Sequence, residues 1–173
     1  MRRVMMYGKV IVKQDDEMLF ECKNDILTNG YRWLCSMWLC ESIGSVNIGS
    51  KLFTIRTGKG NVPNNHSTTT LETPITIAPS TAFGTGIVRI GNRCETKFMA
   101  SWPSGILNTQ LGELEKIEEL GLYFGMCNNQ TARWTNATWG QDVFSRVVLE
   151  DNAFVPDPTR LVIVEWIIGV DFV

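Results

Sequence analysis

The residues that could carry chemistry are few and widely spaced. The only histidine, His66, lies among Asn, Ser and Thr residues in a polar segment. A Ser-His-Asp or Cys-His arrangement needs a base that packed elements hold beside its nucleophile, and a polar loop does not provide this. Gly58-Lys59-Gly60 contains part of a phosphate-binding loop, but the full G-x-x-x-x-G-K-[ST] pattern is missing. The sequence therefore predicts neither a nucleophilic nor a nucleotide-dependent enzyme.

An acidic stretch offers the next set of candidate groups, namely Glu113, Glu115, Glu118 and Glu119. Carboxylates could bind a metal ion or form the acid–base pair of a glycosidase, but Lys116 interrupts the stretch and no calcium-loop spacing is present. We expect a solvated acidic face here. The sequence as a whole predicts no catalytic residue, no cofactor and no bound metal.

The cysteines and the amino terminus indicate the compartment. The five cysteines form an odd set without a C-x-x-C pair, so we expect reduced thiols that pack as small apolar groups. The first residues are interrupted by Gly8, Lys9 and Lys13 and lack the apolar block of a secretory signal. These features predict synthesis in a cytosol.

Six tryptophans are more informative than the ionisable residues. Trp38 and Trp166 fall on apolar stripes and are predicted to be core residues. Trp102 ends a predicted strand, while Trp134 and Trp139 lie in a polar segment. The two tryptophans of the polar segment either fold back onto the domain or anchor a partner, since Trp is enriched at interface hot spots. A platform that stacks on a sugar is a further alternative.

Composition sets the class of protein. At 173 residues, with 44% apolar and 20% charged residues, the chain is predicted to be one globular domain covering residues 1–173. A net charge of −2 gives no electrostatic reason to bind nucleic acid or an anionic membrane. No apolar run approaches the roughly 18 residues of a membrane-spanning helix. We expect no nucleic-acid partner and no membrane partner.

The last stretch, Arg160–Val173, predicts the strand against which the rest packs. Its even-numbered positions from Val162 to Phe172 are all apolar, whereas the odd-numbered ones mix apolar and charged groups. This alternation is typical of a central strand with one fully buried face. The other predicted strands are Val4–Val12, Met18–Cys22, Lys51–Thr57, Ile87–Trp102 (or a hairpin bent at Gly91-Asn92), Lys116–Phe124 and Asp142–Leu149.

Two further elements complete the predicted fold. A helical stripe formed by Tyr31, Leu34, Cys35, Trp38 and Leu39 predicts one α-helix near residues 28–42. The first two strands form an N-terminal hairpin within residues 3–23. Together these elements predict a mainly β protein, an antiparallel β-sandwich of jelly-roll or immunoglobulin-like type with one helix.

The long polar segment 58–86 is the candidate arm or loop. Nearly thirty residues rich in Thr, Asn, Pro and Gly are unusual in a compact domain unless they have a role. We expect this arm to contact another copy of the chain in a homo-oligomer, with a trimer as the first guess. The candidate partner interface comprises Leu71, Ile75, Ile77, Phe83, Trp134 and Trp139.

The order of short motifs along the chain carries a resemblance. The motifs are N-D-I-L-T-N-G (24–30), T-G-K-G (57–60), T-T-L-E (69–72), F-M-A-S-W (98–102), E-E-L-G-L-Y-F (118–124) and V-F-S-R-V-V-L (143–149), followed by the closing strand. In this order they resemble those of small tailed-bacteriophage virion structural proteins over most of residues 20–173. The chain departs from the pattern where T-G-K-G replaces a plain G-T-G, and in the additional hairpin within Met1–Phe20.

The resemblance implies a β-rich virion subunit without catalysis. It implies a role in the tail, neck or fibre-attachment apparatus, through contacts with copies of itself and other virion proteins, or alternatively head decoration. It also implies localisation in the virion after synthesis in the host cytoplasm. A carbohydrate-binding module that uses Trp102, Trp134 and Trp139 is the alternative from another class, so a glycan partner stays open. An enzyme with an unrecognised site is the least favoured.

Overall fold

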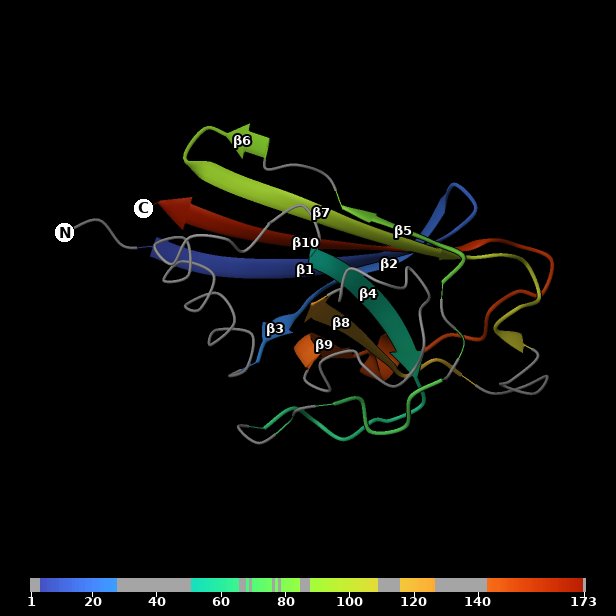
Figure 1. The fold of residues 1–173 in the computed structure, drawn as a ribbon. Helices are drawn as coiled ribbons and strands as arrows, with labels where there is room; N and C mark the ends of the chain where they lie inside the picture. The colour runs from blue at the N-terminus through green and yellow to red at the C-terminus, as the bar shows by residue number, and fades with distance from the viewer. Residues whose placement is uncertain are drawn as a thin grey trace.

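The computed structural model describes residues 4–27, 51–65, 68, 70–75, 77, 79–84, 88–108, 116–126 and 143–172. In this part of the chain, the strands form two antiparallel sheets that pack against each other (Figure 1). The predicted antiparallel β-sandwich is therefore confirmed. The helix predicted near residues 28–42 lies outside the described residues.

The larger sheet is built around the closing strand. Its order is β2 (Glu17–Lys23), β1 (Val4–Gln14), β10 (Val162–Phe172), β7 (Arg93–Trp102) and β5 (Thr81–Gly84), and β6 (Val88–Ile90) also pairs with β7. Strand β10 pairs with β1 on one side and with β7 on the other. The predicted central position of this strand is confirmed.

The smaller sheet has the order β3 (Asp25–Ile26), β9 (Val143–Val148), β8 (Glu119–Met126) and β4 (Lys51–Gly58). A short 3-10 turn, η2 (Glu150–Asn152), follows β9. Figure 1 shows this sheet below the larger one, with β3 continuing from the end of β2. The N-terminal hairpin thus delivers the chain from one sheet to the other.

The core lies between the two sheets. It is formed by the side chains that alternation along the strands directs to the inner faces of the sheets. Trp166, from the centre of β10, and Trp102, from the end of β7, are both 0% exposed. They pack with Val10 and Val12 of β1 and with Leu122 of β8. The prediction that Trp166 is a core residue is confirmed.

Some details of the strands differ from those predicted. Of the two alternatives for Ile87–Trp102, the structure has the hairpin, with Gly91 in the turn at a φ of +61°. Strand β8 begins at Glu119, not at Lys116. The short strands β3 and β5 were not predicted, because two and four residues are too few for alternation to stand out.

Candidate functional site

Four of the six short motifs, T-G-K-G, T-T-L-E, E-E-L-G-L-Y-F and V-F-S-R-V-V-L, meet on the outer face of the smaller sheet, whereas F-M-A-S-W lies in β7 of the larger sheet. Leu120 and Leu122 of β8 face the core, so strand alternation places Glu119 and Gly121 on the opposite face. In the adjacent strand, Arg146 lies opposite Gly121. A carboxylate, a guanidinium and a glycine from two separate motifs therefore share one face.

Glu119 is fully buried and its carboxylate is saturated with donors. Its Oε1 atom accepts hydrogen bonds from the backbone N–H groups of Gly60 (3.1 Å) and Thr73 (2.8 Å). Its Oε2 atom accepts one from the N–H of Glu72 (3.1 Å) and one from Nε of Arg146 (2.8 Å). The Nη2 atom of Arg146 lies 2.7 Å from the same oxygen. One side chain thus binds the backbone of the 58–86 segment at both of its motifs.

Arg146 extends this contact to the exposed part of the loop. The guanidinium is almost fully buried, and its Nη1 atom donates to the carbonyl of Val62 (2.8 Å) and to Oδ1 of Asn64 (2.9 Å). The Asn64 amide donates in return to the Arg146 carbonyl (3.0 Å). We call Glu119, Arg146 and the backbone at Gly60, Glu72 and Thr73 the clasp.

Glycines make room for the clasp. A Cβ atom at Gly58 would overlap the Glu119 carboxylate, and one at Gly60 would lie 2.7 Å from Oε1 of the same residue. At Gly121, a Cβ would lie 2.9 Å from a methyl group of Leu71. The glycines of T-G-K-G and of E-L-G-L-Y-F therefore allow the loop to approach the sheet closely.

The same loop covers apolar surface on this face. Leu71 is 2% exposed and packs with Leu27, Tyr123 and Val143 in a second apolar cluster. The Leu71 N–H donates to the Tyr123 hydroxyl (3.0 Å). Ile75 is 5% exposed and belongs to the main core. Figure 1 shows the described part of the segment running along the smaller sheet.

This packing corrects the expectation of a free arm. Leu71 and Ile75 were predicted to contact another chain, but both side chains are buried in their own domain. Ile77 is half-buried against the same core, and its carbonyl accepts a hydrogen bond from Nε1 of Trp102 (3.3 Å). The backbone of Phe83 belongs to β5, which pairs with β7. Trp134 and Trp139 lie outside the described residues.

Hydrogen bonds at the N-D-I-L motif join the larger sheet to the smaller one. Asn24 is buried, its N–H donates to the carbonyl of Gly8 (3.2 Å), and its side-chain amide donates to the Ser145 hydroxyl. Leu27 N–H donates to the carbonyl of Phe144 (3.1 Å). Asn24 therefore connects the end of the N-terminal hairpin to Ser145 of β9, the residue that precedes Arg146.

The clasp is not suited to acid–base chemistry. Every oxygen of the Glu119 carboxylate is engaged, and burial keeps bulk water away from it. The expected solvated acidic face is wrong at Glu119, because the loop and Arg146 cover this residue. The described residues contain no group of three or more His, Cys, Asp or Glu positioned to hold a metal. His66, Glu113 and Glu115 lie outside them.

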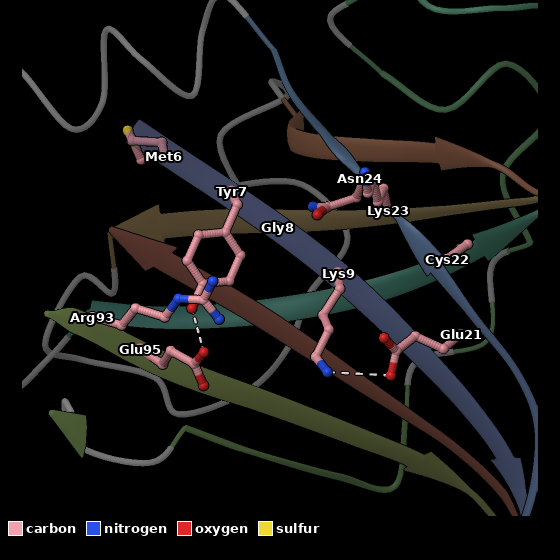
Figure 2. Close-up of a pocket in the computed structure, with 10 residues that line it drawn as sticks. All are labelled: Met6, Tyr7, Gly8, Lys9, Glu21, Cys22, Lys23, Asn24, Arg93 and Glu95. Carbon is pink, nitrogen blue, oxygen red and sulfur yellow. Dashed lines mark hydrogen bonds and ion pairs between the residues drawn. The ribbon is translucent and has the colours of Figure 1, made fainter. Parts of the chain in front are cut away.

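A groove of about 650 Å³ lies along β1 where β2 diverges from it (Figure 2). The Tyr7 ring lies directly against Gly169 of β10, so close that a Cβ atom on Gly169 would overlap it. The Tyr7 hydroxyl donates a hydrogen bond to the Glu95 carboxylate. The Arg93 guanidinium lies 5.4 Å from the centroid of the Tyr7 ring. Burial, and then the hydrogen bond to Glu95, raise the pKa of Tyr7 to about 12.

Charged side chains cross the open face of the larger sheet. The Glu165 carboxylate of β10 binds Nζ of Lys13 (2.7 Å) on one side and Nζ of Lys97 (2.9 Å) on the other. Burial alone would raise the pKa of Glu165, but the hydrogen bonds from both lysines outweigh it and lower the pKa below its ordinary value. The face is thus an ordered network of ion pairs across three strands.

Three further findings concern the cysteines, membrane-spanning helices and similarity to known proteins. Cys22 and Cys94 are free thiols, whereas Cys35, Cys40 and Cys127 lie outside the described residues. Among the described residues, no helix has the length and apolar character needed to cross a membrane. No family model, curated protein or solved structure matches this chain.

Proposed function

We propose that this chain is a structural subunit of a tailed-bacteriophage virion, belonging to the tail, neck or fibre-attachment apparatus and acting through protein–protein contacts. The observation that carries the proposal is the convergence of four of the six short motifs on the clasp. Glu119, Arg146, Gly58 and Gly60 come from three motifs, and each is used to fix the loop on the sheet. Motif residues that fix the conformation of a loop are expected in a protein that acts through the shape of its surface.

The charges of the clasp support a conformational role. A buried ion pair loses hydration on folding and is weak evidence for stability, so its use is better explained by the conformation that it specifies. Here the pair fixes the loop segment that carries Val62, which is 48% exposed, and Asn64. An exposed segment held in one conformation loses less entropy when it binds a partner.

The carbohydrate-binding alternative depends on three tryptophans, and one of them is not available for binding. Trp102 is 0% exposed and its indole N–H donates to the carbonyl of Ile77, so this ring cannot stack on a sugar in the folded domain. Head decoration stays the alternative within the virion class. The proposed partners are copies of this chain and other virion proteins, and the proposed location is the virion.

Purified particles test the proposal. Phage particles from a strain that encodes this chain are banded on a density gradient and quantified by peptide mass spectrometry. We expect the chain at a fixed copy number relative to the other virion proteins, and labelling with a specific antibody at one end of the tail or at the neck. Labelling over the head would favour decoration. A chain that is abundant in the lysate and absent from the particles would contradict the proposal.

A further inference from the structure

Strand β1 is longer than the strand that covers its outer edge. All eleven residues from Val4 to Gln14 pair with β10, but β2 pairs only with the six from Lys9 to Gln14. Beyond that point, Asn24 donates its N–H to the carbonyl of Gly8 and the chain turns away to the smaller sheet. No described strand pairs with the edge of β1 from Val4 to Tyr7.

The contact at Gly8 determines which backbone groups this edge presents. In an extended strand, the N–H and C=O groups of one residue point to the same side, and the side alternates along the chain. The Gly8 carbonyl points to the β2 side. The N–H and C=O groups of Met6 and Val4 therefore point to the same edge, which no described strand covers, while those of Met5 and Tyr7 point to β10.

The sequence of this edge lacks the usual protection against pairing. Exposed edges are commonly blocked by a charged residue, a proline or a bulge. The segment Val4-Met5-Met6-Tyr7-Gly8 has no charged residue and no proline, although the covered part of β1 carries Lys9 and Lys13. Met5 is 58% exposed. The groove beside Met6, Tyr7 and Gly8 leaves space along this edge (Figure 2).

We propose that the Val4–Tyr7 edge pairs antiparallel with the same edge of a second copy, around a two-fold axis at Met5. In this register, Met6 of each copy lies opposite Val4 of the other. Each such pair exchanges both of its outward N–H···O=C hydrogen bonds, so every outward group of the edge gains a partner. The two exposed Met5 side chains meet on the open face of the joined sheet.

The second copy is favoured as the occupant because the edge is complementary to itself. A two-fold axis at Met6 would place Val4 of the second copy opposite Gly8, where Asn24 already binds. An axis at Met5 avoids that position and matches donors with acceptors. An interface related by a two-fold axis closes on itself, so the expected product is a dimer and not a filament.

A cysteine scan provides a sharp test in the full-length purified protein. Met5 would lie in a non-hydrogen-bonded pair, where the two Cα atoms are about 4.5 Å apart, a spacing that suits a disulfide. Met5→Cys should therefore form a covalent dimer under mild oxidation. Met18→Cys is the matched control, because Met18 is 57% exposed and lies on the other hairpin strand. The parent chain controls for the native cysteines.

A second variant tests the hydrogen bonds. Met6→Pro removes an N–H that points to the free edge, and proline is tolerated where that group faces outward. We expect light scattering to show a dimer for the parent chain and a monomer for Met6→Pro, with little change in Tm. A monomeric parent chain would overturn the proposal, as would an oligomer in which Met5→Cys forms no cross-link. Since the test uses the isolated chain, its failure would leave the virion proposal standing.

Discussion

At the scale of single residues, the clasp shows what the sequence hides. The acidic stretch around Glu119 looks like a solvent-facing surface because three other glutamates lie within six residues of it. The alternation of side chains along the strand correctly places Glu119 on the face opposite to the core, where Leu120 and Leu122 lie. The alternation does not reveal that a loop 46 residues earlier and an arginine 27 residues later cover the face that carries Glu119. Only the tertiary packing brings these groups together.

Arg146→Ala should be among the most destabilising single changes in the domain. It leaves the Glu119 carboxylate buried without its countercharge, and breaking a buried ion pair in this way typically costs about 3–5 kcal/mol. The control is Lys9→Ala, which breaks the exposed pair with Glu21 and should cost less than about 1 kcal/mol. Urea denaturation of both variants measures the two free energies of unfolding. Equal losses would mean that the clasp does not anchor the loop on the sheet.

Glu165 gives a prediction for pH. Its folded-state pKa is lowered, so its contribution to stability is present above the pKa of an unfolded glutamate, about 4.3, and is lost as the pH falls through the lower folded-state value. Glu165→Gln should therefore lower the stability at pH 7, by about 1 kcal/mol or less, since both lysines are partly exposed. The difference from the parent chain should shrink below about pH 4. Thermal melts of both proteins across this acidic range and up to neutral pH measure it.

At the scale of elements, alternation is a good guide where a strand is long and buried on one face. The residues of β10, β1 and β4 repeat with a period of two, whereas β9 is buried on both faces and does not alternate; all four strands were predicted with small boundary errors. Strand β5 was missed because its four residues follow Thr- and Pro-rich sequence and owe their pairing to β7. Prediction of strands from the sequence is therefore limited more by short strand length and by dependence on a distant partner strand than by amino-acid composition.

Trp166→Ala tests the central strand. The ring is 0% exposed and β10 is covered by strands on both sides, so the cavity should cost roughly 3–5 kcal/mol. Val88→Ala, on the exposed strand β6, is the control and should change the stability by less than about 0.5 kcal/mol. Thermal denaturation of both variants compares them. An unchanged Tm for Trp166→Ala would refute the central role of this strand.

At the scale of the whole molecule, the described part of segment 58–86 packs on the domain that it was expected to leave. Backbone hydrogen bonds join Lys59 N–H to the Thr73 carbonyl (2.9 Å) and Ile75 N–H to the Thr57 carbonyl (2.8 Å). Ordering a residue costs about 1–2 kcal/mol of backbone entropy. Burial of Leu71 and Ile75 offsets part of that cost, together with the donors that Glu119 accepts. Leu71, Ile75 and Ile77 are thus used within the chain.

Hydrogen exchange can establish whether the clasp holds this segment in solution. In the parent chain, the amides of Gly60, Glu72 and Thr73 should exchange slowly, because each donates to a buried carboxylate. Glu119→Ala removes the acceptor, so peptides covering 58–75 should lose protection by about a factor of ten or more. Peptides from β10 should keep theirs if the domain remains folded, which separates local opening from global unfolding. Slow exchange of 58–75 that persists in Glu119→Ala would mean that the apolar contacts of Leu71 and Ile75 suffice to hold the loop, and the clasp would then serve only to set its conformation.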